Sequence, residues 1–316
     1  MLPGLVLGES LGKAADSICP QKIFHLVVPF SPGTGPDSLA RLIAPRIGQE
    51  LHCVALVENR TGASGEIGAR LVKNSDANNP YYLLTANPIV INSVLTPEQS
   101  VHPINDFYPL TQIATDDLVL VVPKNSSFAN LDDFLIAAHS RGDFLTFASP
   151  GSGTPQFIEM ALLESMSNIH LLHIPYKDTH SALFGLLGNQ IDIMFISLST
   201  ARPHLLDGRL RALAIAAKKR NPLIPNLKTL GELKIQGVDY PIWNGIFSSK
   251  NISAENGERL EELLRKILSD PMIKAKIESL GLKPAPQTDE NFRVFLEKQI
   301  ELIKKYKPVL STSFLG

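Results

Sequence analysis

Two glycine-rich loops hold the residues whose types and spacing are best suited to bind a ligand. The first lies in VVPFSPGTGPDSLAR, between an apolar run and a helical pattern that starts near Asp37. The second lies in LTFASPGSGTPQFIEM and has the same strand-to-helix setting. Such a turn presents free backbone N–H groups and the positive end of a helix dipole, which together attract an anion. If each loop belongs to a different domain, a carboxylate between them receives hydrogen bonds from both sides, each worth about 1.5–3 kcal/mol.

The same loops do not match the motifs of nucleotide or acyl chemistry. No Gly-Lys-Ser/Thr follows the first loop, so it is not a Walker loop, and Asp37 and Ser38 occupy the place of the third glycine of GxGxxG. Around Ser152 the second loop reads SPGSGT and lacks the first glycine of a GxSxG nucleophile elbow. We therefore expect no catalytic residue in either loop.

Metal and redox sites are not indicated either. His170 and His173 are an odd number of residues apart in a strand pattern, so their side chains point to opposite faces, unlike a metal-binding pair. Cys19 and Cys53 are too far apart for a CxxC motif. We expect neither a metal ion nor a cofactor.

Two further features each allow two interpretations. Cys19 and Cys53 lie just upstream of the strand patterns IFHLVV and VALVEN; if these strands are neighbours, an oxidising compartment favours a disulfide, and otherwise the cysteines are two unrelated small buried side chains. Asp192 either reaches the ligand cleft or caps a turn.

A third glycine-bearing loop, VENRTGASGEIGARL, has Glu66 at the start of its helix. This carboxylate repels a phosphate, so we interpret the glycines of the loop as positions of close packing.

Alternating strand and helix patterns place these loops in an α/β fold. Short β-branched runs alternate with amphipathic stretches, which is typical of parallel sheets covered on both faces. In the segment after Asp37, apolar residues recur at helical spacing, and Pro45 is expected to kink that helix. The predicted strands begin near Ile23, Val54, Tyr81, Leu118, Leu145, His170, Ile191, Leu210 and Trp243.

The order of these patterns predicts a split first domain. We expect domain 1 to comprise residues 22–120 and 241–316, domain 2 to comprise residues 121–240, and residues 1–21 to be either a remnant of a secretion signal or a disordered N-terminus. Two strands that cross between the domains would form a hinge that closes over a ligand.

Composition narrows the function classes. The 316 residues carry 30 Lys and Arg against 31 Asp and Glu, without the basic stripe that nucleic acid requires. No apolar run reaches the roughly 18 residues of a membrane span. We expect a monomer that neither binds nucleic acid nor inserts into a membrane.

Several motifs in a fixed order resemble one known family, the substrate-binding receptors of tripartite tricarboxylate transporters, also called Bug proteins. The resemblance extends from about Ile23 to the C-terminus. The motifs that carry it are VVPFSPGTGPDSLARLIA, VENRTGASGEIGA, YYLLTAN, NDFYPLTQIA, LTFASPGSGT, HIPYK, LGNQIDIMF and GRLRALAI.

The resemblance implies a periplasmic, two-domain Venus-flytrap receptor. Its mainly parallel sheets would be joined by two crossing strands, and it would deliver a small carboxylate, such as an organic, acidic amino or aromatic acid, to membrane transporter subunits. Carried over by position, the first clamp would comprise Ser31, Pro32, Gly33, Thr34, Gly35 and Asp37, and the second Ser149, Gly151, Gly153 and Thr154, with Asn87 and Asp192 as further cleft residues.

This sequence departs from the family pattern at several of those loops. Thr34 and Ser31 stand where the family commonly has Gly and Pro, Phe157 replaces a common His, and Asp178 replaces the Gly that often follows HxPYK. The identity of the ligand therefore stays open. Two other functions are weighed against the receptor: an α/β enzyme acting on a small acyl or phosphate group, which needs a convergent nucleophile and base, and a sensory receptor subunit.

Overall fold

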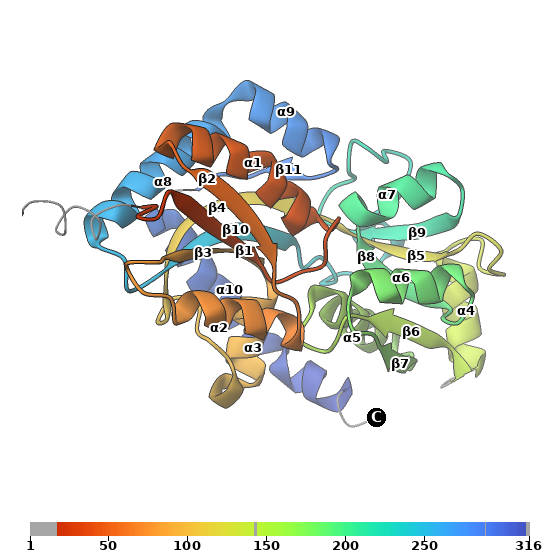
Figure 1. The fold of residues 1–316 in the computed structure, drawn as a ribbon. Coiled ribbons are helices and arrows are strands. Elements are labelled where there is room, and N and C mark those ends of the chain that lie inside the picture. The colour runs from red at the N-terminus through yellow and green to blue at the C-terminus, as the bar shows by residue number, and fades with distance from the viewer. Residues whose placement is uncertain (1–17, 142–143, 288, 314–316) are drawn as a thin grey trace, which may run out of the picture.

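The chain forms two β-sheets that lie side by side, each flanked by helices (Figure 1). The computed structural model describes residues 18–141, 144–287 and 289–313, so most of the predicted signal remnant lies outside the described residues. The first sheet has the order β11-β4-β10-β3-β1-β2. Its strands are β1 (Ile23–Val28), β2 (Val54–Asn59), β3 (Tyr81–Ala86), β4 (Phe107–Asp116), β10 (Ile242–Ser249) and β11 (Lys283–Pro284).

The second sheet is built from the middle of the chain and has the order β7-β6-β8-β5-β9. Its strands are β5 (Leu118–Pro123), β6 (Thr146–Ser149), β7 (Leu172–Pro175), β8 (Ile193–Ser197) and β9 (Leu210–Ala216). All six residues of β5 are buried, as a central strand covered on both faces requires.

The α/β class and the predicted two-sheet architecture are confirmed, and a strand lies at each of the nine predicted positions. Both sheets are mixed rather than mainly parallel, because β5 and β10 run antiparallel to their neighbours. β4 is not among the strands predicted from the sequence. Pro109 and the polar residues of FYPLTQIATD obscure its strand pattern, and β4 is fixed instead by its long antiparallel pairing with β10.

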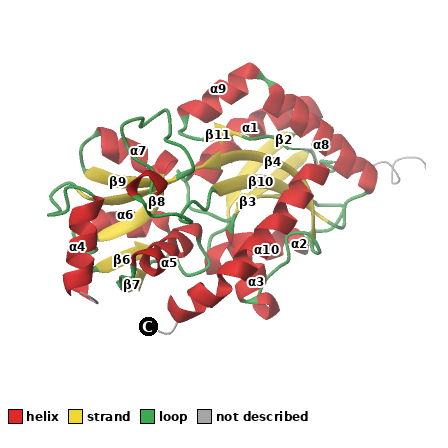
Figure 2. Cartoon of the chain, turned by 180° about the vertical axis from the view of Figure 1, so that it is seen from behind, coloured by secondary structure: helices red, strands yellow, loops and turns green. Residues whose placement is uncertain are grey.

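Ten α-helices cover the sheets in the described part of the chain (Figure 2). α1 buries Leu39, Ile43 and Ile47 against the first sheet, as its apolar spacing predicts, and it continues through Pro45. The helices are α1 (Gly35–Leu51), α2 (Glu66–Lys73), α3 (Pro88–Leu95), α4 (Leu131–Arg141), α5 (Pro155–Ser167), α6 (Thr179–Leu187), α7 (Leu198–Leu206), α8 (Ala254–Ser269), α9 (Pro271–Ser279) and α10 (Asp289–Ser313).

Two stretches of chain connect the sheets. β4 of the first sheet runs almost directly into β5 of the second through Asp116 and Asp117, and the chain returns from β9 to β10. The long helix α10 contacts both α3 and α5, so it joins the two halves at the back of the molecule (Figure 2). Trp243, at the start of β10, is fully buried against Phe292 and Phe295 of α10.

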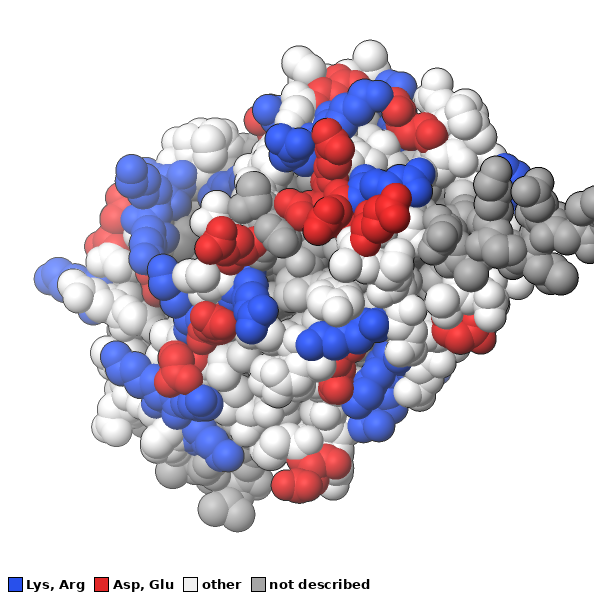
Figure 3. All heavy atoms as spheres, turned by 90° about the vertical axis from the view of Figure 1, so that its left-hand side faces the viewer, with Lys and Arg blue, Asp and Glu red and all other residues white. Residues whose placement is uncertain are grey.

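The surface carries charges of both signs. On the face at the left of Figure 1, Lys and Arg side chains are interspersed with Asp and Glu side chains (Figure 3). Exposed pairs such as Lys266 and Glu50, whose Nζ and Oε2 atoms are 2.8 Å apart, contribute at most about 1 kcal/mol each to stability.

The two cysteines lie near each other but are not joined by a disulfide. β1 and β2 are neighbouring parallel strands, which brings Cys19 and Cys53 to the same edge of the first sheet. Both side chains are thiols in the structure. Burial is the main cause that raises the pKa of the Cys53 thiol, and the contact with Cys19 is the second cause. The protonated form is therefore favoured at neutral pH.

Candidate functional site

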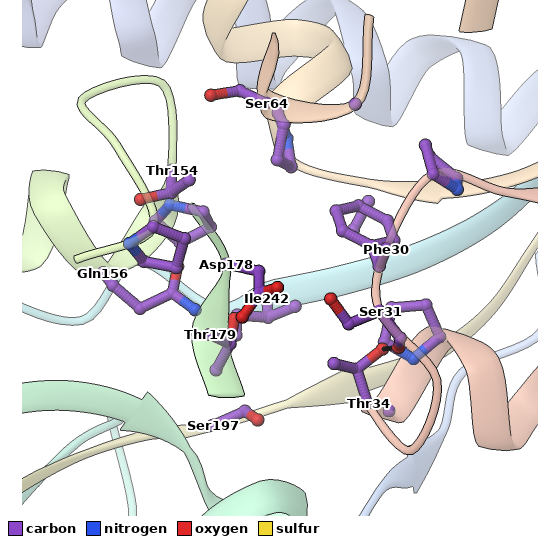
Figure 4. A pocket seen from close by; sticks show the side chains of 18 of the residues that line it. Phe30, Ser31, Thr34, Ser64, Thr154, Gln156, Asp178, Thr179, Ser197 and Ile242 are labelled. Atoms are coloured by element: carbon purple, nitrogen blue, oxygen red, sulfur yellow. Dashed lines mark hydrogen bonds between the residues drawn. The ribbon is translucent and has the colours of Figure 1, made fainter. Parts of the chain in front are cut away.

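A cavity of about 100 Å³ lies where the two sheets face each other. Both halves of the molecule contribute to its wall (Figure 4). From the first half come Phe30, Ser31, Thr34, Gly35, Thr61, Ser64 and Asn244; from the second come Thr154, Gln156, Asp178, Thr179, Ser197 and Thr200; and Asp116 lines it where the halves join.

Six helices point their N-termini at this cavity, because it lies beyond the carboxyl ends of the parallel strands that precede them. The lining includes residues at the N-terminal ends of α1, α2, α3, α5, α6 and α7, namely Gly35, Gly65, Pro88, Thr154, Thr179 and Ser197. Each helix end is equivalent to roughly half a positive charge. The cavity therefore attracts anions although, among the described residues, a single cationic side chain, the exposed Lys177, lines it.

The protein's own carboxylates already compensate some of these helix ends. Asp178 caps α6 by accepting from Ser181 N, α1 and α2 carry Asp37 and Glu66 in their first turns, and Asp116 accepts from Ser199 N in α7. By contrast, α3 and α5 have no acidic residue in the first turn and no side-chain bond at the N-cap. These two ends, one from each half, are the best placed for an anionic guest.

The two glycine-rich loops have the same internal hydrogen bond. Thr34 Oγ1 donates to Ser31 O at 2.8 Å, and Thr154 Oγ1 donates to Gly151 O at 2.6 Å. Because each hydroxyl hydrogen is used within its own loop, it is not available to a guest. The donors at the cavity wall include the first-turn N–H groups of Gly35 and Gln156 and the side-chain amide of Gln156.

Asp37 supports the first loop from behind. It does not line the cavity, and its carboxylate accepts from Gly33 N (2.9 Å), Arg41 Nε (3.1 Å) and Asn59 Nδ2 (2.9 Å). Burial alone would raise the pKa of Asp37, but these hydrogen bonds hold it below its usual value. Asp37 is thus a charged residue that fixes the shape of the loop.

Ser149 supports the second loop in a similar way. Ser149 Oγ accepts from Gly151 N at 3.1 Å and lies 2.8 Å from His173 Nε2. Burial lowers the pKa of His173 to about 4, so this histidine is neutral at physiological pH. Although Ser149 and His173 are a hydroxyl and a neutral imidazole in contact, Ser149 is fully buried and neither residue lines the cavity. A substrate in the cavity cannot reach this pair.

The remaining predicted site residues hold the halves together or lie elsewhere. Pro32 O is 2.9 Å from His180 Nε2 of α6, and Gly151 and Gly153 lie against Ser64 and Asn92 of the other half. Asn87 accepts from Trp243 N and donates to Pro241 O, which ties β3 to the start of β10. Asp192 accepts from Thr146 N and Oγ1 and does not line the cavity. Of the twelve predicted residues, Ser31, Thr34, Gly35 and Thr154 line it.

The floor of the cavity consists of residues that the sequence analysis did not single out. Asp116 is 2% exposed and accepts from Ser199 Oγ and N, while burial raises the pKa of its carboxyl to about 7. Ile242 and Asn244 lie beside it on β10. The signal available in the sequence was a polar pair, Asp116 and Asp117, that separates two strand-like segments.

The described residues provide no group of three or more His, Cys, Asp and Glu side chains that could hold a metal ion. In the same part of the chain, no helix is long and apolar enough to cross a membrane.

Comparison with known proteins gives consistent matches. The family described as tripartite tricarboxylate transporter family receptor matches residues 39–312. A UPF0065 protein from the tcbD-tcbE intergenic region of Pseudomonas sp. strain P51 is 31% identical over 91% of this chain and 87% of its own length. Bordetella pertussis BugT is 25% identical over 89% of this chain and 87% of its own length.

Solved structures share the fold. R. palustris Rpa4515 with adipate has a TM-score of 0.87 at 23% identity and covers 92% of this chain and 98% of its own. MatC from Rhodopseudomonas palustris with bound malate has a TM-score of 0.83 at 24% identity and covers 91% of this chain and 99% of its own.

Proposed function

Because this chain belongs to the tripartite tricarboxylate transporter receptor family, as its motif order indicated, we propose that it is a receptor that closes around a small carboxylate. One observation carries the proposal: the N-termini of α3 and α5 meet at the cavity from opposite halves, and neither has a carboxylate of the protein or an N-cap side-chain bond. A guest carboxylate would accept from Gln156 N at the end of α5, and at the end of α3, where Pro88 has no N–H, it would be stabilised by the helix dipole.

Two related folds support a carboxylate as the guest. The structures of Rpa4515 and MatC contain adipate and malate, respectively. The cavity of this chain is lined by backbone N–H groups, hydroxyls and helix ends, and none of the described residues that line it is an arginine. Charge-assisted hydrogen bonds of about 1.5–3 kcal/mol each are sufficient for useful affinity in such a site.

The proposed receptor works by moving two domains. We assign residues 22–120 and 241–316 to one domain and residues 121–240 to the other; the two sheets support this division except at residues 118–120, which belong to β5 of the second sheet. Binding would stabilise the closed arrangement, in which His180 contacts Pro32, and would present that arrangement to membrane transporter subunits. A periplasmic location and a monomeric state follow from this role. A sensory subunit would use the same closure with a different membrane partner.

An enzyme remains the rival from another class. It would require a nucleophile and a base that converge on the cavity. The contact between Ser149 and His173 lies behind the cavity wall, which favours the receptor.

Titration with organic acids, amino acids and aromatic acids tests the proposal. We expect at least one small carboxylate to bind with micromolar or lower Kd in isothermal titration, to raise the unfolding temperature, and to be recovered unchanged after long incubation. Turnover of a compound in the panel, without a carboxylate that binds and is left intact, would favour the enzyme.

A further inference from the structure

The cavity is chemically polarised between two sides. Figure 4 shows Thr154 and Ser64 on one side and Ser197 and Thr34 on the other, with Asp178 reaching toward Ser31. The side formed by α3 and α5 carries no carboxylate of the protein. The other side carries two, because Asp178 caps α6 and Asp116 contacts Ser199 of α7.

Asp116 and Asn244 share one face of the crossing strands. In the antiparallel pairing of β4 with β10, Asp116 lies opposite Ile242 and Ala114 lies opposite Asn244. Opposed residues and those two apart along a strand share a face, so Asp116 and Asn244 both project into the floor, about 7–8 Å apart as diagonal neighbours. One small molecule can contact both.

The Asn244 amide points to a missing partner. Asn244 is 1% exposed, it lines the cavity, and its Oδ1 accepts no hydrogen bond within the described part of the chain. A buried acceptor left unpaired costs about 1–3 kcal/mol. A hydrogen-bond donor on the guest would remove that cost, and Asp116 beside it is a second acceptor.

The carboxylates that line the cavity favour a positively charged hydrogen-bond donor on the guest. Asp178 is held in its charged form, since hydrogen bonds from Ser181 and Ser31 outweigh the effect of burial and lower its pKa. A second carboxylate on the guest would meet a cavity wall that contains the carboxyl groups of Asp116 and Asp178, and like charges placed together in an interface cost several kcal/mol. An ammonium group would instead be attracted to both and would donate to Asn244.

We propose that the guest is a zwitterion, with its carboxylate at the N-termini of α3 and α5 and its ammonium group at Asp116, Asp178 and Asn244. This inference rests on the proposed receptor function and adds a substrate class to it: amine-bearing monocarboxylates rather than dicarboxylates. The cavity volume is about 100 Å³, and by the same measure one water molecule needs about 10–15 Å³. The cavity therefore accommodates a guest with on the order of ten non-hydrogen atoms or fewer.

Protonation of Asp116 makes the preference for a zwitterion over a dicarboxylate depend on pH. The groups that face it are Ser199 and Gly35 across the cavity floor, while its neighbour Asp117 is paired with Lys283 and Asn221. Asp116 titrates near pH 7, whereas an alkyl ammonium stays charged to about pH 10. The zwitterion therefore binds more tightly as the pH rises from 5.5 to 8, and a dicarboxylate binds less tightly over the same interval.

Three matched sets of compounds test the proposal by isothermal titration: ω-amino acids, unsubstituted monocarboxylates and dicarboxylates, each with chains of three to six carbons. At the length that binds best at pH 8, we expect the amino acid to bind at least tenfold more tightly than the monocarboxylate and the dicarboxylate to bind weakest. In Asp116→Asn the advantage of the amino acid should fall at least tenfold and its dependence on pH should be lost. The control Asp117→Asn should retain the advantage of the amino acid at pH 8 and a dependence on pH, with the midpoint moved to lower pH because the charge of Asp117 raises the pKa of Asp116.

The outcomes separate the inference from the function on which it rests. A dicarboxylate that binds the wild-type protein most tightly at pH 8 overturns the zwitterion and leaves the carboxylate receptor intact. An amino acid whose affinity is the same in wild type and in Asp116→Asn overturns it as well. If none of these compounds and no carboxylate of the wider panel binds, both the inference and the receptor function are wrong.

Discussion

Replacing Gly153 by alanine is expected to weaken carboxylate binding by at least about 100-fold while leaving the fold intact. A Cβ atom at Gly153 would lie 2.0 Å from Asn92 Oδ1 and 3.4 Å from Ser64 Oγ, both of which belong to the other half of the molecule. The φ of Gly153 is outside the left-handed region, so alanine is compatible with the local backbone. The clash therefore acts between the halves and opposes closure. Isothermal titration measures the loss, and small-angle scattering should show a larger radius of gyration.

A second substitution distinguishes obstructed closure from local damage. Asn92→Ala removes the atom that the new Cβ would meet, so the double variant with Gly153→Ala should regain affinity to within about tenfold of Asn92→Ala alone. The unfolding free energy of Gly153→Ala should change by less than about 1 kcal/mol, because no core side chain is altered. Wild-type affinity in Gly153→Ala, or no recovery in the double variant, would contradict the closed arrangement as the binding form.

Thr154→Asp is expected to abolish binding and at the same time to stabilise the empty protein. Thr154 is the N-cap of α5, and its hydroxyl donates to Gly151 O instead of accepting from the helix. An aspartate there would cap the free N–H groups and add negative charge at the helix end, which together contribute roughly 0.5–1 kcal/mol. The same charge would occupy the place of the guest carboxylate, so we expect affinity to fall at least about 100-fold.

Thr154→Asn is the matched control, because asparagine caps a helix about as well as aspartate but carries no charge. It should gain a similar stability in thermal unfolding and, although it occupies the same N–H groups, it should bind the carboxylate at least about tenfold more tightly than Thr154→Asp because it adds no negative charge. If Thr154→Asp binds carboxylates as the wild type does, the N-terminus of α5 is not where the anion sits.

Local sequence signals predicted the α/β class, the nine strand positions and the two loops, because these features depend on neighbouring residues. IFHLVV and LVLVVP are continuous apolar runs, and a glycine-rich turn before a helical pattern is recognisable without knowing its partner. Ser31, Thr34, Gly35 and Thr154 were accordingly identified, and all four line the cavity. β4 was not, because its stability comes from pairing with β10, more than one hundred residues later in the chain.

Local sequence patterns also could not predict the floor of the cavity, because it forms only when β4 and β10, which are distant in the chain, pair with each other. Asn244 lies within the run IWNGIF and resembles an ordinary polar residue of a strand, and its unpaired oxygen becomes apparent only after β10 is placed beside β4. Asp37 and Ser149 were predicted to contact the ligand, but neither residue lines the cavity. Their loops suggested contact with a ligand, but the structure gives their polar atoms to the backbone and side chains behind the loops.

The most direct test of the account compares a carboxylate with its neutral amide. The tightest-binding carboxylate of the panel and the carboxamide of the same length have nearly the same shape, and they differ in the charge that the N-termini of α3 and α5 would stabilise. Isothermal titration at pH 8 should give a Kd at least about 100-fold lower for the carboxylate. Equal affinities for the two compounds would show that the cavity does not select an anion, and would contradict the account.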